Sequence, residues 1–142
     1  MNTPTNWNVL FVDDSKTEIN YLKLLFQLTD IPLTPNFINS APTAIDTLKE
    51  MEASAFPDIV IVDINMPLMS GFEFAELYFD TFNTKYPNTR LFIYSTSIHS
   101  ADIRRAETTR GCAGFIAKPF TENTFSEFIL PHLSKSVAEQ PG

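Results

Sequence analysis

The stretch Ile59-Val60-Ile61-Val62-Asp63 joins the most β-prone run of the chain to a carboxylate. Consecutive β-branched residues are typical of a strand that is buried on both faces of a parallel sheet. A second apolar run, Val9–Val12, is followed directly by Asp13 and Asp14. Because residues that follow parallel strands gather at the carboxyl edge of the sheet, we expect these three carboxylates to lie close together.

The rest of the chain alternates between strand and helix patterns. Apolar runs predict further strands at 33–39, 91–94 and 114–117, and apolar residues at helical spacing predict helices at about 15–28, 42–51, 71–85, 101–110 and from 121 onward. Pro35 cannot donate to a strand ladder, which places its strand at a sheet edge, and Pro131 is expected to end or kink the last helix. We therefore predict an α/β fold of the flavodoxin-like, doubly wound type, with a five-stranded parallel sheet in the order 2-1-3-4-5 and five helices.

The composition fits one globular domain. The chain has 142 residues, of which 44% are hydrophobic and 19% are charged, which is ordinary for a soluble domain. A formal charge of −7 without a Lys/Arg cluster disfavours direct nucleic-acid binding. A single cysteine fits a reducing compartment and no apolar stretch could span a bilayer, so we expect a cytoplasmic protein without membrane insertion. We expect an N-terminal extension at 1–7, the domain at 8–134 and a tail at 135–142.

A lysine completes the predicted site. Lys118 follows the last predicted strand and precedes Pro119, which should bring its ammonium to the edge where Asp13, Asp14 and Asp63 meet. One such acid alone could simply cap a helix. Three carboxylates with an ammonium predict a divalent-cation site that can handle phosphate, because hard cations prefer oxygen ligands.

The ordered set of motifs resembles the receiver domain of two-component response regulators. The set comprises Asp13-Asp14, Asp63-Ile-Asn65-Met-Pro67, Thr96 and Lys118-Pro119, each at the end of a predicted strand. The spacing from Thr96 to Lys118 is that of the family, and the resemblance covers roughly Asn8 to Leu133. One of these motifs alone is a weak signal, whereas the ordered set is specific.

The resemblance implies a phosphorylation site and a metal site. Asp63 would accept a phosphoryl group from a histidine kinase or a histidine phosphotransfer protein in a Mg²⁺-dependent reaction. Asp14 and Asp63 would be direct metal ligands, and Asp13 would act mostly through bound water. The backbone carbonyl of Asn65 would complete the ligands that the protein supplies.

The resemblance also implies a switch. Lys118 would neutralise the phosphoryl oxygens, and its bond to Pro119 would be cis. Thr96 would hydrogen-bond the phosphoryl group, and Phe115 would turn into the space that is vacated, although Phe115 can equally be a simple core residue. The apolar Ile98 is expected to slow hydrolysis of the phosphoryl group.

The function that follows is a stand-alone receiver that signals by phosphorylation-dependent binding of a downstream effector protein. We do not expect an enzyme that acts on external substrates, and neither His99 nor His132 fits a phosphorelay role. Two alternatives remain. A haloacid-dehalogenase-like phosphatase also uses an aspartyl nucleophile with Mg²⁺, but it requires an acid where this chain has Asn65. A pseudo-receiver would bind partners independently of phosphorylation.

Overall fold

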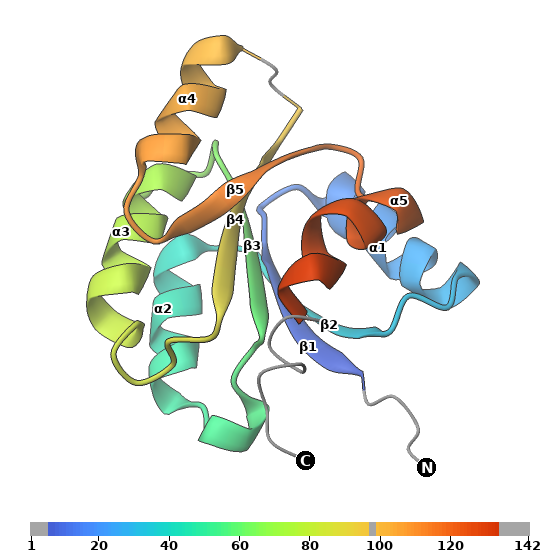
Figure 1. Cartoon of the computed structure of the whole chain (residues 1–142), viewed down its shortest axis with the longest axis horizontal. Coiled ribbons are helices and arrows are strands. Elements are labelled where there is room, and N and C mark those ends of the chain that lie inside the picture. Colours follow the sequence, from blue (N-terminus) through green and yellow to red (C-terminus); the bar gives the residue numbers. More distant parts are fainter. Residues whose placement is uncertain (1–5, 97–98, 134–142) are drawn as a thin grey trace.

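A five-stranded parallel sheet organises the chain, as the computed structural model of residues 6–96 and 99–133 shows (Figure 1). The strand order is β2-β1-β3-β4-β5, which confirms the predicted order. The strands are β1 (Trp7–Val12), β2 (Leu33–Ile38), β3 (Ile59–Asp63), β4 (Arg90–Ser95) and β5 (Cys112–Ala117). The helices are α1 (Lys16–Leu28), α2 (Ala41–Glu50), α3 (Gly71–Phe82), α4 (Ser100–Thr108) and α5 (Glu122–Thr124), with a short 3₁₀ turn, η1 (Ala53–Ala55), before β3.

Helices cover both faces of the sheet, so the core has two halves (Figure 1). On one face, β1, β3 and β4 pack against α2, α3 and α4 in a cluster that includes Val60 and Ile93. On the other face, the same strands pack against α1 and the last helix in a cluster that includes Phe11 and Ile129. All of β3 is buried, as the unbroken β-branched run predicts.

Side-chain caps start the helices near their predicted positions. Ser15, Ser40 and Thr121 are the N-cap residues of α1, α2 and α5, and each side chain accepts a hydrogen bond from the backbone N–H three residues further on. Ser70 and Glu73 form a reciprocal capping box at α3. These caps fix the points at which α1 and α3 begin: α1 starts directly after Asp14 and Ser15, and α3 starts after the loop that follows Asp63.

The end of α3 differs from the sequence expectation. The pattern predicts a helix to about Lys85, but α3 ends at Phe82. Tyr86 stacks on Phe56 with the two ring centroids 3.6 Å apart, and the chain turns to reach that contact. Tertiary packing of an aromatic pair therefore overrides the helical pattern of the last residues.

Of the two predicted effects of Pro131, an end or a kink of the last helix, the end does not occur there. The helix continues to Leu133 through a π-helical segment, η2 (Phe125–Ile129), in which the N–H of Leu130 donates to the carbonyl of Phe125. In a regular α-helix the proline ring would clash with the carbonyl four residues earlier, and the wider turn relieves that conflict.

Some expectations fall outside the described residues. These include residues 1–5 of the expected extension, the expected tail at 135–142, and Ile98. Across the ranges that the structure covers, no helix is both long and apolar enough to cross a bilayer.

Candidate functional site

Three carboxylates meet at the carboxyl edge of the sheet. Asp13 and Asp14 follow β1, and Asp63 ends β3, the parallel neighbour of β1. One carboxylate oxygen of each acid lies within 4.8 Å of the others. Asp13 and Asp63 are buried, with 1% and 7% of their surface exposed, whereas Asp14 is exposed. The cluster is closed by protein on the inner side and open to solvent at Asp14.

The ammonium of Lys118 lies between the two buried acids. Its Nζ atom is 2.8 Å from an oxygen of Asp13 and 3.0 Å from an oxygen of Asp63. The backbone N–H of Lys118 donates to the carbonyl of Ser95 at 2.9 Å, and the peptide bond to Pro119 is cis. The four charged residues that the sequence places at this edge therefore lie together.

Burial and the neighbouring charges have opposite effects on the pKa values of Asp63 and Lys118. Burial raises the pKa of Asp63, and the Lys118 ammonium and the Asn65 N–H only partly offset that rise. Burial lowers the pKa of Lys118, but its hydrogen bond to Asp13 and the charges of both carboxylates outweigh burial, so the pKa of Lys118 is raised. The ammonium therefore stays protonated and offsets one negative charge of the cluster.

The donor set fits a hard divalent cation. The cluster of Asp13, Asp14 and Asp63 offers only carboxylate oxygens, and Mg²⁺ prefers oxygen ligands while keeping several waters. The exposed side at Asp14 leaves room for those waters. Asn65 is exposed, and its N–H donates to Asp63 at 3.1 Å. Its carbonyl stays a predicted ligand.

The two predicted switch residues lie on the neighbouring strands. Thr96 follows β4 directly and is exposed at the edge that carries the acids. Phe115 lies in β5 opposite Ile93 and is half-buried against the core half that includes Ala106 of α4. Their movement on phosphorylation stays a prediction.

The loop between β3 and α3 returns tightly onto the end of β3. The N–H of Gly71 donates to the carbonyl of Ile64 at 2.9 Å, and a Cβ atom at Gly71 would lie 2.4 Å from the carbonyl oxygen of Asp63. No side chain fits in that space. This close approach holds the backbone that carries Asp63 in place.

Sequence reasoning missed a tyrosine and a glutamate that support the site. The buried Tyr94 of β4 places its ring 5.0 Å from the Nζ atom of Lys118. Its hydroxyl donates to Glu18 of α1 and accepts from the N–H of Phe120 at 3.0 Å. Burial raises the pKa of Tyr94, and the Glu18 carboxylate raises it further, so the hydroxyl keeps its proton. In the sequence, the only feature that could have pointed to Tyr94 is a hydroxyl near the end of an apolar strand. Nothing in the sequence distinguishes Glu18 from other acidic residues of a helix.

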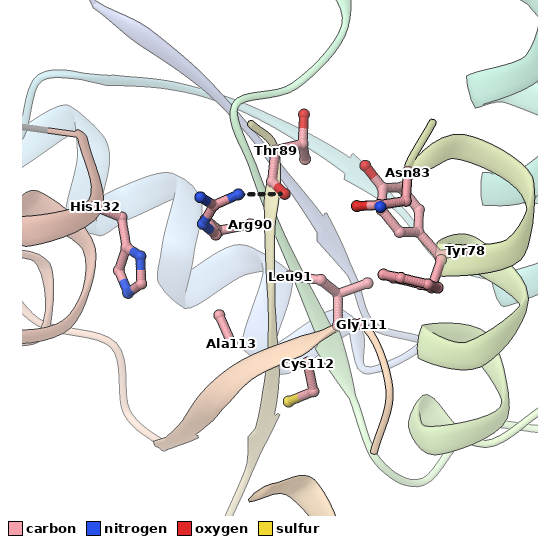
Figure 2. A pocket seen from close by; sticks show the side chains of 10 residues that line it. Tyr78, Asn83, Thr89, Arg90, Leu91, Gly111, Cys112, Ala113 and His132 are labelled. Atoms are coloured by element: carbon pink, nitrogen blue, oxygen red, sulfur yellow. Dashed lines mark hydrogen bonds between the residues drawn. The ribbon is translucent and has the colours of Figure 1, made fainter. Parts of the chain in front are cut away.

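A cavity of about 340 Å³ lies at the opposite edge of the sheet (Figure 2). Its lining includes Tyr78 of α3, Arg90 and Cys112 at the starts of β4 and β5, and His132. Figure 2 shows Arg90 and His132 on one side of β4, and Tyr78 on the other. The acids lie at the carboxyl ends of the strands, whereas this cavity borders the starts of β4 and β5. The cavity is therefore separate from the acid cluster.

Comparison with known proteins gives one family. The family model of the response regulator receiver domain matches residues 9–130. A two-component response regulator from Cytophaga hutchinsonii has a TM-score of 0.81 and 24% identity, covering 96% of this chain and all of that chain. A response regulator receiver protein from Dyadobacter fermentans has a TM-score of 0.77 and 27% identity, covering 89% of this chain and 97% of that one.

Among the curated proteins that match this chain, two match over a small part of their own length. Two-component response regulator ARR10 of Arabidopsis thaliana is 38% identical over 74 residues, which are 52% of this chain and 13% of that protein. Sensor histidine kinase CheAY of Helicobacter pylori is 27% identical over 137 residues, which are 96% of this chain and 16% of that protein. The chain therefore spans only a small part of these relatives. With its sheet order, its acid cluster and the family model in agreement, this chain belongs to the response regulator receiver domain family of two-component systems.

Proposed function

We propose that Asp63 accepts a phosphoryl group from a histidine kinase or a histidine phosphotransfer protein, in a Mg²⁺-dependent reaction, and that the phosphorylated domain then binds a partner protein. The observation that carries this proposal is the Lys118 ammonium, held between Asp13 and Asp63 inside a cluster of three carboxylates. Receiver domains are signalling modules and not classical enzymes, and the proposed output is accordingly a change in binding.

The proposed reaction forms an acyl phosphate. A carboxylate oxygen of Asp63 attacks the phosphorus of a phosphohistidine, and the new P–O bond forms as the P–N bond breaks. The imidazole nitrogen keeps the electron pair and takes a proton from water. Phosphoryl transfer depends chiefly on positioning and charge neutralisation, and Lys118 would exchange its contact with Asp63 for one with a phosphoryl oxygen. Mg²⁺ held by Asp13, Asp14, Asp63 and the Asn65 carbonyl would supply further positive charge.

The open side of the cluster supports a protein as phosphodonor. Asp14 is exposed, and the loop residue Asn65 beside Asp63 is exposed as well. A phosphohistidine on another protein needs an accessible edge of this kind. The match to a protein named as a sensor histidine kinase is consistent with that class of partner.

Thr96 and Phe115 would change position in response to phosphorylation of Asp63. Phosphorylation adds negative charge and strong acceptor oxygens. The hydroxyl of Thr96 would donate to one of these oxygens and draw the segment after β4 inward. Phe115 would then move into the vacated space, held by packing alone because it has no hydroxyl. Phosphorylation biases an equilibrium between the two arrangements, and the partner binds one of them more tightly.

Intact-mass measurement of Asp63→Asn tests the proposal. Wild-type protein incubated with Mg²⁺ and acetyl phosphate should gain the mass of one phosphoryl group, and the variant should not. Asp46→Asn, which removes an exposed acid of α2, is the control and should be modified like the wild type. Equal modification of wild type and Asp63→Asn would contradict the proposal.

Phosphotransfer profiling would identify the donor. Histidine kinases of the host, each autophosphorylated with labelled ATP, are mixed with wild type and with Asp63→Asn. We expect one kinase to transfer label rapidly to the wild type and none to label the variant. Sustained hydrolysis of generic phosphate esters by the wild type would instead favour the phosphatase alternative.

A further inference from the structure

We infer that Tyr94, held by Glu18, is a positioning residue for the Lys118 ammonium. This inference rests on the proposed phosphoryl transfer at Asp63. Three elements meet at Tyr94: its own strand β4, the helix α1 that carries Glu18, and the segment after β5 that carries Lys118. The arrangement determines where the charge that faces the phosphoryl group is held.

The ring of Tyr94 is a third neighbour of the ammonium, in addition to the two acids. The Nζ atom of Lys118 lies 2.8 Å from an oxygen of Asp13 and 3.0 Å from an oxygen of Asp63. The centroid of the Tyr94 ring lies 5.0 Å from the same atom. The negative face of an aromatic ring attracts a cation, most strongly where water is excluded, and Tyr94 is 1% exposed. Attraction to the ring therefore adds to the two ion pairs that hold the ammonium beside both acids.

The hydroxyl of Tyr94 fixes the ring and also the backbone that follows Lys118. It donates to Glu18 and accepts from the N–H of Phe120, two residues after the lysine. The N–H of Lys118 donates to Ser95, the residue after Tyr94. Tyr94 and its chain neighbour therefore hold both the backbone and the ammonium of the lysine.

Such anchoring matters because a lysine side chain is flexible. Its four-carbon stem loses substantial rotamer entropy when it is held in one place, and a misplaced charge does not stabilise the transferring group. Glu18 sits one helical turn after the first two acids, since the N–H of Glu18 donates to the cap residue Ser15. The same helix start that follows Asp13 and Asp14 thereby supports the lysine through Tyr94.

Two pairs of variants test the inference by the initial rate of Asp63 phosphorylation from acetyl phosphate at saturating Mg²⁺. Tyr94→Phe keeps the ring and loses the anchor, and we expect a rate about tenfold lower, less than the hundredfold loss that a misplacement of about 1 Å can cause. Tyr94→Leu loses the ring as well and should be slower still. Glu18→Ala should lose rate, and Glu18→Gln, whose amide oxygen still accepts from the tyrosine, should restore most of it.

Tyr21→Phe is the matched control. The hydroxyl of Tyr21 donates to the carbonyl of Phe120 at 2.6 Å, so this variant also removes one tyrosine hydrogen bond to the same residue. It leaves the Tyr94 ring and the Glu18 anchor in place, and its rate should stay close to that of the wild type. A rate loss in Tyr21→Phe as large as in Tyr94→Phe would show that only general rigidity of the segment matters, and would overturn the inference.

Two further measurements separate positioning from a general structural effect. Magnesium affinity, measured by calorimetry, should change little in Tyr94→Phe, because the carboxylates that bind the ion are intact. In the proton NMR spectrum, the Lys118 side-chain signals near the amino group should carry a ring-current shift that is lost in Tyr94→Leu, with Lys118→Arg used to assign them. Absence of that shift in the wild type would contradict the inference.

The outcomes distinguish the two proposals. If wild type and Tyr21→Phe are not modified on Asp63, the proposed function fails. If both are modified, and Tyr94→Phe and Glu18→Ala react at the wild-type rate, the function stands and the role of Tyr94 is refuted. Glu18 is only half-buried on a surface helix, so its two variants test the inference even if the Tyr94 variants do not fold.

Discussion

Replacing Lys118 with methionine should destabilise the metal-free protein strongly. Methionine keeps most of the length of the side chain and removes its charge. Asp13 and Asp63 then face each other at 1% and 7% exposure without the ammonium that each contacts within 3.0 Å. Removal of one partner leaves buried charge without compensation, which is the costly way to break an ion pair.

The magnitude follows from the two lost contacts. A hydrogen bond to a charged group contributes about 1.5–3 kcal/mol, and breaking a buried pair costs about 3–5 kcal/mol in total. Because the cluster is open to solvent on the side of Asp14, we expect the lower end, about 3 kcal/mol. With an m-value of about 2 kcal/mol/M in urea, the unfolding midpoint should fall by about 1.5 M.

The assay is urea denaturation at pH 7 in EDTA and again in excess Mg²⁺. In EDTA the midpoint of Lys118→Met should lie well below that of the wild type. Mg²⁺ at a hundred times its dissociation constant adds about 2.7 kcal/mol, and it should stabilise the variant more than the wild type because no ammonium competes for the acids. Lys49→Met, at an exposed position of α2, is the control and should change little. Equal midpoints of Lys118→Met and wild type in EDTA would refute the reasoning.

Two further variants probe the backbone around the site and the charge at the other end of β3. Gly71→Ala should lower the free energy of unfolding by about 1–3 kcal/mol, because the new Cβ would meet the Asp63 carbonyl at 2.4 Å. Urea denaturation measures this loss. Gly114→Ala is the control and should lose clearly less stability, because its Cβ would lie 3.6 Å from the Phe92 ring. Burial raises the pKa of Asp58 above its ordinary 3.8 although the Asn8 N–H donates to it. The folded state therefore favours the protonated acid, so the wild type should lose stability relative to Asp58→Asn as the pH rises from about 3 to 6. A constant difference between the urea midpoints of the two proteins over that range would contradict the raised pKa of Asp58.

The parts of the fold that the sequence predicts are those controlled by local pattern. Apolar runs such as Ile59–Asp63 identify buried strands, and Pro35 identifies the edge strand, which together give the sheet order. The acids were predictable because each follows a parallel strand, so the topology alone brings them to one edge. Lys118 followed from the same rule.

The missed features depend on contacts between distant segments. Tyr94 and Glu18 are 76 positions apart, and no periodicity links a helix residue to the end of a strand. The early end of α3 depends on the stacking of Tyr86 on Phe56, which the helical pattern does not contain. The continuation of the last helix past Pro131 requires a wider turn, which single-sequence rules do not foresee.

The adjacent residues Asp13 and Asp14 are not equivalent. As the chain leaves β1, the first side chain points into the protein and the second points toward solvent. Asp13 has both oxygens occupied, one by the Ser15 N–H and the other by Lys118, while Asp14 faces water. Adding one methylene at Asp13 would force its neighbours apart, whereas the same change at Asp14 would move the carboxylate away from the place where we expect it to bind the metal ion. An alignment that scores this doublet as a block would treat as equivalent an acid held by the protein and an acid that faces the ion.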